Sequence, residues 1–244
     1  QRGDEMAALE AVLHARRTDP RLGAWLEAAT PDTPAQAAQI RLIARSYDKA
    51  RKVPGDLAAE IARVTSVAQG IWAQARRDED LAGFLPMLGR VVDLRRQEAQ
   101  ALSQGGDAYD ALLDNYEPGA TGAEIAAVFD RMRPRIRALR EALMAAPAAP
   151  VLQGHFPKAQ QLALAQEIAH AFGYDMDRGR IDEAVHPFSS GSFNDVRITT
   201  RVDESEPLGC LYSTIHEVGH AGYEQNIDQS YGLSVLGQGV SMGV

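Results

Sequence analysis

Two histidines four residues apart, with a glutamate beside the first, form the strongest chemical pattern in this sequence: His216-Glu217-Val218-Gly219-His220. Residues i and i+4 lie on the same face of a helix, so His216 and His220 can bind one zinc ion together. Glu217 can act as general base on a water molecule whose pKa the metal lowers. This HExxH pattern therefore predicts metal-dependent hydrolysis of a peptide or amide bond.

The segment around this motif is predicted to be a helix with one apolar side. The apolar residues at helical spacing are Leu208, Leu211, Ile215 and Val218. They would face a core and leave the motif on another face of the helix. A histidine pair on a helix can also be an ordinary solvated or hydrogen-bonded surface, so the five-residue motif by itself leaves both interpretations open.

A third metal ligand is the element that this sequence does not supply. Catalytic zinc normally has three protein ligands. Glu224 lies eight residues after His216, about 12 Å along a helix, which is too far for one ion to contact both side chains. We expect Glu224 to provide a supporting hydrogen bond instead. Residues 225–244 contain no Glu, His or Cys, so the third protein ligand is expected to be missing from this chain.

Charge and composition exclude several classes of partner. Lys and Arg number 25 against 33 Asp and Glu, which gives a formal net charge of −8. That balance disfavours a nucleic-acid partner, because phosphate binding needs clustered cations. The single cysteine, Cys210, permits no intrachain disulfide and fits a reducing cytoplasm. No apolar run reaches about 18 residues, so no membrane partner is expected.

The elements that must position the motif are predicted to be mostly helices. The clearest apolar stripe consists of Leu57, Ile61, Val64, Ala68, Ile71 and Ala75. Thr33 and Thr121 each open a capping box, which predicts a helix start. The Ala-Pro stretch at residues 145–150 predicts a break between an N-terminal helical part, residues 1–150, and a part of the catalytic region, residues 151–244.

A strand with one charged face is predicted at residues 195–203. Val196, Ile198, Thr200 and Val202 alternate there with Asp195, Arg197, Thr199, Arg201 and Asp203. The charged face can be solvated, or it can point into a peptide-binding cleft. His186, which precedes Pro187, is compatible with a structural hydrogen bond or with a substrate contact.

Three motifs in order carry a family resemblance: His186-Pro-Phe-Ser-Ser-Gly191, Asp195-Val-Arg-Ile-Thr199 and the HExxH segment. This set resembles the M32 metallocarboxypeptidases, the thermostable carboxypeptidase Taq family. Similar residues at 109–119 and 179–182 extend the resemblance over most of the chain. It implies a mainly α-helical, gluzincin-like HExxH fold with a small β-sheet beside an active-site cleft, and a homodimer. It also implies release of C-terminal amino acids from peptide substrates with broad specificity.

The matched positions imply roles for individual residues. His216 and His220 would bind one zinc or cobalt ion per chain, with Glu217 as the catalytic base. Further residues matching family motifs near the active site, as substrate-binding or supporting groups, are His186, Asp195, Arg197 and Thr199. Members of the family continue beyond a segment like residues 237–244 into a His-Glu-Ser motif whose glutamate is the third ligand.

The extent of the match leaves more than one function open. We expect this chain to be a truncated metallocarboxypeptidase. The alternative from another class is an inactive truncated relative that acts as a folded or partner-binding module. An oligoendopeptidase is a third possibility, and peptides with blocked C-termini would separate it from a carboxypeptidase.

Overall fold

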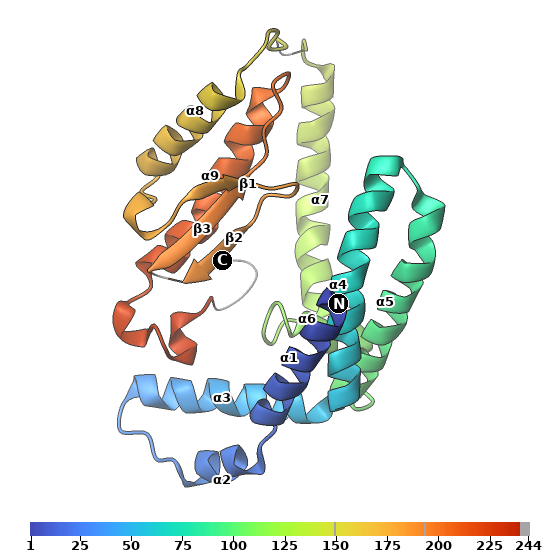
Figure 1. The fold of residues 1–244 in the computed structure, drawn as a ribbon, viewed down its shortest axis with the longest axis vertical. Helices are drawn as coiled ribbons and strands as arrows, with labels where there is room; N and C mark the ends of the chain where they lie inside the picture. The colour runs from blue at the N-terminus through green and yellow to red at the C-terminus, as the bar shows by residue number, and fades with distance from the viewer. Residues whose placement is uncertain (149, 193, 240–244) are drawn as a thin grey trace. The chain divides into compact units, whose positions relative to one another are not determined.

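The structure is a computed structural model that describes residues 1–148, 150–192 and 194–239. It is mainly helical with one three-stranded sheet (Figure 1), which confirms the predicted fold class. The chain forms two compact units, Gln1–Asp130 and Arg131–Val244. The division of the chain into parts at residue 150 stays a prediction. Among the described helices, none combines the length and the apolarity needed to cross a membrane.

The first unit consists of helices. Its helices are α1 (Arg2–Arg17), α2 (Pro20–Ala28), α3 (Pro34–Lys52), α4 (Gly55–Asp78), α5 (Leu81–Ser103) and α6 (Ala108–Leu113), followed by the start of α7 (Gly122–Ala145). Helix α4 packs against α1 and α5. The predicted stripe on α4 is confirmed by the buried Ile61, Val64 and Ala68, and Leu94 of α5 packs against the first two.

Both predicted capping boxes are confirmed. The Thr33 hydroxyl accepts from the Gln36 amide at 3.2 Å, and the Gln36 side chain accepts from the Thr33 amide at 3.0 Å, so α3 begins directly after Thr33. Thr121 and Glu124 make the same reciprocal pair at 3.2 Å and 3.0 Å before α7. Each box satisfies amide donors that the first helical turn leaves free.

An ion-pair cluster ties α3 to the loop after α6. The Asp114 carboxylate lies 2.5 Å from the Arg45 guanidinium and 2.7 Å from the Lys49 ammonium. It also accepts from the Gly119 amide at 3.0 Å. Burial opposes ionisation of Asp114, but the hydrogen bonds from Lys49, Gly119 and Arg45 outweigh it and lower its pKa from 3.8 to about 2.

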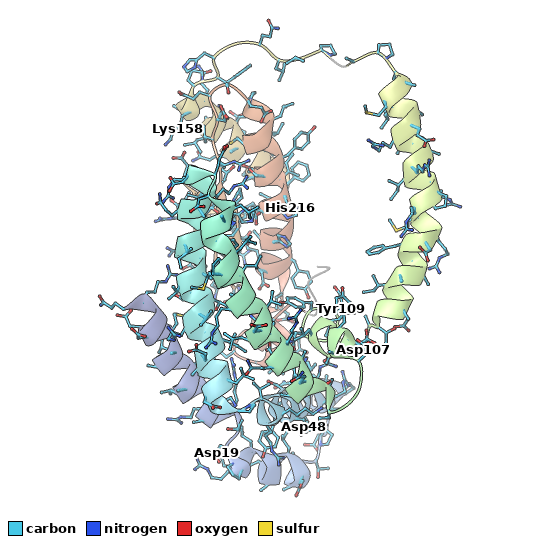
Figure 2. The ribbon with its side chains drawn as sticks, turned by 90° about the vertical axis from the view of Figure 1, so that its right-hand side faces the viewer. Asp19, Asp48, Asp107, Tyr109, Lys158 and His216 are labelled. Atoms are coloured by element: carbon cyan, nitrogen blue, oxygen red, sulfur yellow. The ribbon has the colours of Figure 1, made fainter. Side chains whose placement is uncertain are left out.

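Asp114→Asn is therefore expected to destabilise the protein by about 2 kcal/mol near pH 7. Because the folded-state pKa lies below the unfolded value, this stabilisation is present above about pH 4 and is lost as the pH falls towards 2. Urea unfolding followed by circular dichroism at several pH values measures it. Asp48→Asn, an exposed change on α3 (Figure 2), is the control. A deficit that stays constant from pH 7 to pH 2 would contradict the prediction.

The second unit places a small sheet against two helices. Its elements after α7 are α8 (Lys158–Ala171), η1 (Met176–Arg178), β1 (Ile181–Glu183), β2 (Ser189–Ser192), β3 (Asp195–Thr200), α9 (Pro207–Asn226), η2 (Gln229–Tyr231) and η3 (Val235–Gly237). The strand order is β1-β3-β2, with β1 parallel and β2 antiparallel to the central β3. Helix α9 packs against α8, β3 and β2.

The predicted strand is confirmed over Asp195–Thr200 but ends three residues earlier than Asp203. It ends because the Asp203 carboxylate accepts from the amide and hydroxyl of Ser205, which turns the chain towards α9. The predicted alternation holds for Val196, Ile198 and Thr200, which are fully buried, but it fails at Thr199, which was expected on the charged face and is also buried. The core residues around them are Ala169, Tyr174, Val218 and Ala221.

The helix predicted around the HExxH motif is confirmed as α9, but its predicted apolar side is only partly right. Of the four residues expected to pack, Val218 is buried, Leu211 and Ile215 are half-buried, and Leu208 is 38% exposed. The buried side consists instead of Cys210, Thr214, Glu217, Val218, Ala221 and Gln225. Thr214 and Gln225 are tolerated there because hydrogen bonds satisfy their side chains, as the 3.1 Å bond from the Thr214 hydroxyl to the Thr200 hydroxyl shows.

Candidate functional site

The two motif histidines are spaced for a shared ion. Both project from α9, where Figure 2 labels His216, and their Nε2 atoms lie 3.3 Å apart. The two rings are close to perpendicular, with an interplanar angle of 84°. Two nitrogen ligands of one tetrahedral zinc ion lie about 3.4 Å apart. The same separation permits a hydrogen bond between two neutral rings, but it is also the geometry that one divalent ion needs.

A pocket of about 480 Å³ lies over this face of α9. One wall is the helix itself, with the histidine pair, Glu217, Tyr223 and Glu224. The opposite wall is the chain from His186 to Gly191, which forms the turn before β2 and the first part of that strand. Two segments about thirty positions apart in the sequence thus line the same pocket. The family motif that begins at His186 is part of that lining.

Glu217 lies in the pocket beside the two histidines, where a general base could reach a water molecule on the metal. Its residue is only 6% exposed, yet its side chain lines the pocket beside His216 and His220. A carboxylate can accept a proton from water within hydrogen-bonding distance, and partial burial limits competition from bulk solvent. The pocket can therefore hold a metal ion, a water molecule and a proton acceptor together.

Thr199 supports the pocket wall without lining it. Its hydroxyl accepts from the Phe188 amide at 2.8 Å, and its own amide donates to the Phe188 carbonyl at 2.9 Å. These bonds fix the turn that carries His186 and Pro187 into the pocket. The geometry thus favours the supporting role for Thr199 over substrate contact.

Asp195 and Arg197 lie on the solvent-exposed face of β3 and are not among the residues that line the pocket. Two hydrogen bonds join their side chains, at 2.8 Å and 2.9 Å. The bonds from Arg197 hold the pKa of Asp195 below its usual value. A substrate-binding role for this pair stays a prediction.

Glu224 lines the pocket two helical turns beyond His216. Burial raises the pKa of its carboxyl group. The supporting hydrogen bond expected for Glu224 is not made to any residue in the described part of the chain. Within that part, no three His, Cys, Asp or Glu side chains are grouped closely enough to hold a metal ion. Glu224 therefore does not complete the ligand set of the histidine pair.

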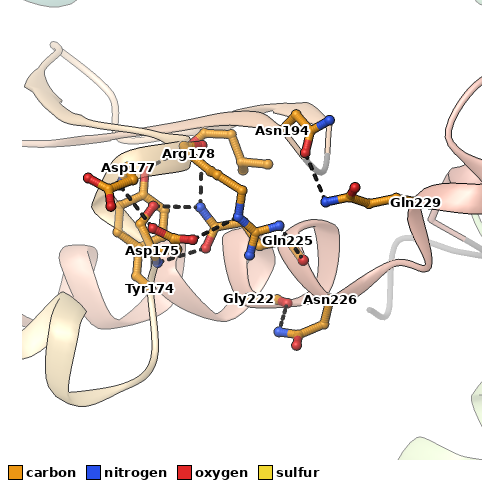
Figure 3. Close-up of polar contacts among 10 residues, drawn as sticks. Tyr174, Asp175, Asp177, Arg178, Asn194, Gly222, Gln225, Asn226 and Gln229 are labelled. Atoms are coloured by element: carbon orange, nitrogen blue, oxygen red, sulfur yellow. Dashed lines mark hydrogen bonds and ion pairs between the residues drawn. The ribbon is translucent and has the colours of Figure 1, made fainter.

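A buried glutamine that no sequence pattern singled out anchors the end of α9 (Figure 3). The Gln225 carboxamide accepts from the Asp175 amide and donates to the Asp175 carbonyl, both at 2.9 Å. Arg178 donates to the Gln225 carbonyl at 3.0 Å. These bonds hold the last turn of the helix, which carries Tyr223 and Glu224, against the segment before β1. A glutamine in a polar helix end gives no signal of such a role.

Gln225→Ala is expected to lower the free energy of unfolding by about 1–3 kcal/mol, because the partly buried backbone groups of Asp175 lose their partners. Thermal or urea unfolding measures this change. Asn226→Ala is the matched control, since among the described residues the exposed Asn226 side chain bonds only to Gly222 of its own helix, and we expect less than about 0.5 kcal/mol there. Equal effects of the two changes would mean that the hydrogen bonds between Gln225 and Asp175 contribute little to the free energy of unfolding.

Comparison with known proteins agrees with this geometry. Residues 1–244 match the sequence model of the family described as Carboxypeptidase Taq (M32) metallopeptidase. Thermostable carboxypeptidase 1 of Thermus thermophilus is 37% identical over all of this chain and 51% of its own length. Carboxypeptidase 1 of Bacillus subtilis is 34% identical over 84% of this chain and 42% of its own.

Solved structures match the whole fold. The crystal structure of BsuCP superposes with a TM-score of 0.92 at 30% identity, covering 99% of this chain and 50% of that one. The M32 carboxypeptidase from Deinococcus radiodurans gives 0.85 at 34% identity, covering 98% and 50%. The chain spans about half the length of these relatives. By its sequence, its fold and the placement of its motifs, this chain belongs to the M32 family of metallopeptidases.

Proposed function

We propose that this chain carries the metal-binding histidines and the catalytic base of a metallocarboxypeptidase that uses one zinc or cobalt ion. The enzyme would release C-terminal amino acids from peptides with broad specificity. The observation that carries this proposal is the pair of imidazoles, spaced for one ion, in a pocket shared with the buried Glu217. The relatives named carboxypeptidases, from Thermus and Bacillus, support it.

The residues divide the chemistry between them. A divalent ion held by His216 and His220 would supply a Lewis acid that polarises the scissile carbonyl and lowers the pKa of the attacking water. Glu217 takes the proton from that water and passes it to the leaving amine. His186 faces them from the opposite wall, where it can contact the substrate, and Thr199 keeps that wall in place.

We also propose that the protein works in the cytoplasm as a homodimer. A single cysteine suits a reducing compartment, because such a protein gains nothing from oxidising conditions. The homodimer rests on the family resemblance. Sedimentation of the purified protein, together with fractionation of the cells that make it, tests both statements.

A peptidase assay with a matched substrate pair tests the reaction. The enzyme should be the longest natural polypeptide that carries residues 1–244, loaded with zinc or cobalt. An N-blocked dipeptide with a free C-terminus should release its last amino acid, and the same peptide as a C-terminal amide should not. Comparable cleavage of both would indicate an oligoendopeptidase. Cleavage of neither, with metal bound, would favour the inactive binding module.

A polypeptide limited to residues 1–244 is expected to bind zinc or cobalt more weakly than a complete three-ligand site. Two imidazoles leave the ion open to water and exchange, since no third ligand is found in the described part of the chain. Dialysis against a strong chelator followed by metal analysis measures the retained ion. Stoichiometric metal after prolonged dialysis would show that a further protein ligand exists within these residues.

A further inference from the structure

Strand β2 lies at an edge of the sheet, with β3 on its inner side. In an antiparallel pair, the backbone groups of successive residues point alternately towards the partner strand and away from it. The Thr199 amide of β3 points towards β2, because it donates to the Phe188 carbonyl at 2.9 Å. The Ile198 amide points the other way, because it donates to the Arg180 carbonyl at 3.0 Å. Ser189 is the register partner of Ile198, so its own amide and carbonyl point away from β3.

The outer side of Ser189 belongs to the pocket over α9. Ser189 lines this pocket, and its amide and carbonyl have no hydrogen-bond partner in the described part of the chain. Two residues further on, Gly191 has a φ of 121°, outside the range of a regular strand, so the regular part of this edge is at Ser189. An unpaired donor and acceptor on an edge strand form a template for one more strand.

The opposite wall of the pocket has no free backbone amide. It consists of residues between His216 and Glu224 in the interior of α9, where the backbone amides donate within the helix. A peptide that enters the pocket gives up its hydrogen bonds to water, and each of its amide groups left without a partner weakens binding. The Ser189 backbone provides a donor and an acceptor side by side, at the spacing of a strand.

The orientation of Ser189 therefore suits the main chain of a peptide. We propose that a substrate peptide binds as an additional strand on the outer edge of β2, with the Ser189 carbonyl accepting from one peptide amide and the Ser189 amide donating to one peptide carbonyl. This inference rests on the proposed function, because it assumes that a peptide occupies the pocket. A carboxypeptidase substrate has one residue after the scissile bond, so the residues along β2 are those before it.

Substrate analogues test the bond to the Ser189 carbonyl. The parent probe is acetyl-Ala-Ala-Ala, and in two analogues an ester oxygen replaces the N–H of the first or the second alanine. Isothermal titration of the longest natural polypeptide that carries residues 1–244, loaded with metal, measures the affinities. Glu217→Gln is present throughout, so that the probes stay intact. We expect one of the two esters to bind about tenfold more weakly than the parent, because it cannot donate to the Ser189 carbonyl.

Variants of β2 test the bond from the Ser189 amide. Ser189→Pro removes this N–H, and proline is accepted on an edge strand where the N–H would face away from the partner strand. Ser189→Ala removes the same hydroxyl but keeps the amide, so it is the matched control. We expect Ser189→Pro to bind the parent peptide about tenfold more weakly than Ser189→Ala does. The ester series needs no change in β2, so it decides the question if Ser189→Pro fails to fold.

The possible results separate this inference from the proposed function. The inference is overturned if both esters bind as tightly as the parent, if Ser189→Pro binds as tightly as Ser189→Ala, or if Ser189→Ala weakens binding as much as Ser189→Pro. In each of these cases the parent peptide still binds, and the proposed function stands. If the metal-loaded protein does not bind the parent peptide, the proposed function fails, and this inference fails with it.

Discussion

Glu217→Gln is expected to lower kcat for hydrolysis of peptides with a free C-terminus by about 10²–10⁴-fold. The amide has nearly the same shape as the carboxylate, but it cannot accept the proton of the attacking water. Glu217 is not one of the two imidazole ligands, so the bound metal should be retained. Activity and metal content should therefore separate in this variant.

The measurement compares initial rates and metal content in the same preparation of the longest natural polypeptide that carries this sequence. Glu167→Gln makes the same chemical change on the exposed side of α8 and should leave both unchanged. A Glu217→Gln protein with near-normal turnover would remove Glu217 from the mechanism. Loss of the metal together with the activity would mean that Glu217 is needed for metal binding.

His216→Ala is expected to reduce the affinity for zinc or cobalt by more than about 100-fold. Loss of a residue that only supports a metal ligand already costs about 10–100-fold, and His216 is proposed as a direct ligand. The chelate would be broken, because His220 alone would remain of the pair on α9. The 3.3 Å between the two Nε2 atoms is the geometric basis of this expectation.

Competition with a chromophoric chelator measures the affinity. His155→Ala is the control, since His155 is exposed and does not line the pocket. An unchanged affinity in His216→Ala would place the ion elsewhere on the protein. An equal loss in His155→Ala would indicate that the metal binds non-specifically to histidines.

Local features were predictable from the sequence because they depend on neighbours in the chain. The capping boxes at Thr33 and Thr121 need only residues three positions apart, and both formed as expected. The strand at Asp195 follows from strict alternation, which one buried face of a sheet imposes. The histidine pair follows from helical spacing alone.

The packing of α9 was predicted poorly because hydrophobicity does not record hydrogen-bond partners. Leu208 looked like a core residue but is exposed, whereas Thr214 and Gln225 are buried. Thr214 is accepted in the core because the hydroxyl of Thr200 lies opposite it. Gln225 is accepted because the backbone of Asp175, fifty positions away, offers both a donor and an acceptor. Such partners become visible only when the chain is folded.

By itself, the sequence determined the chemical groups of the centre, since the spacing of His216, Glu217 and His220 on any α-helix places them on neighbouring turns. Only the tertiary structure decided that the turn at His186 forms the opposite wall, that Thr199 braces that wall, and that Glu224 lies in the pocket. The physical reason is that helix periodicity fixes directions within one element. The distance between elements depends on how β2, β3 and α9 pack together.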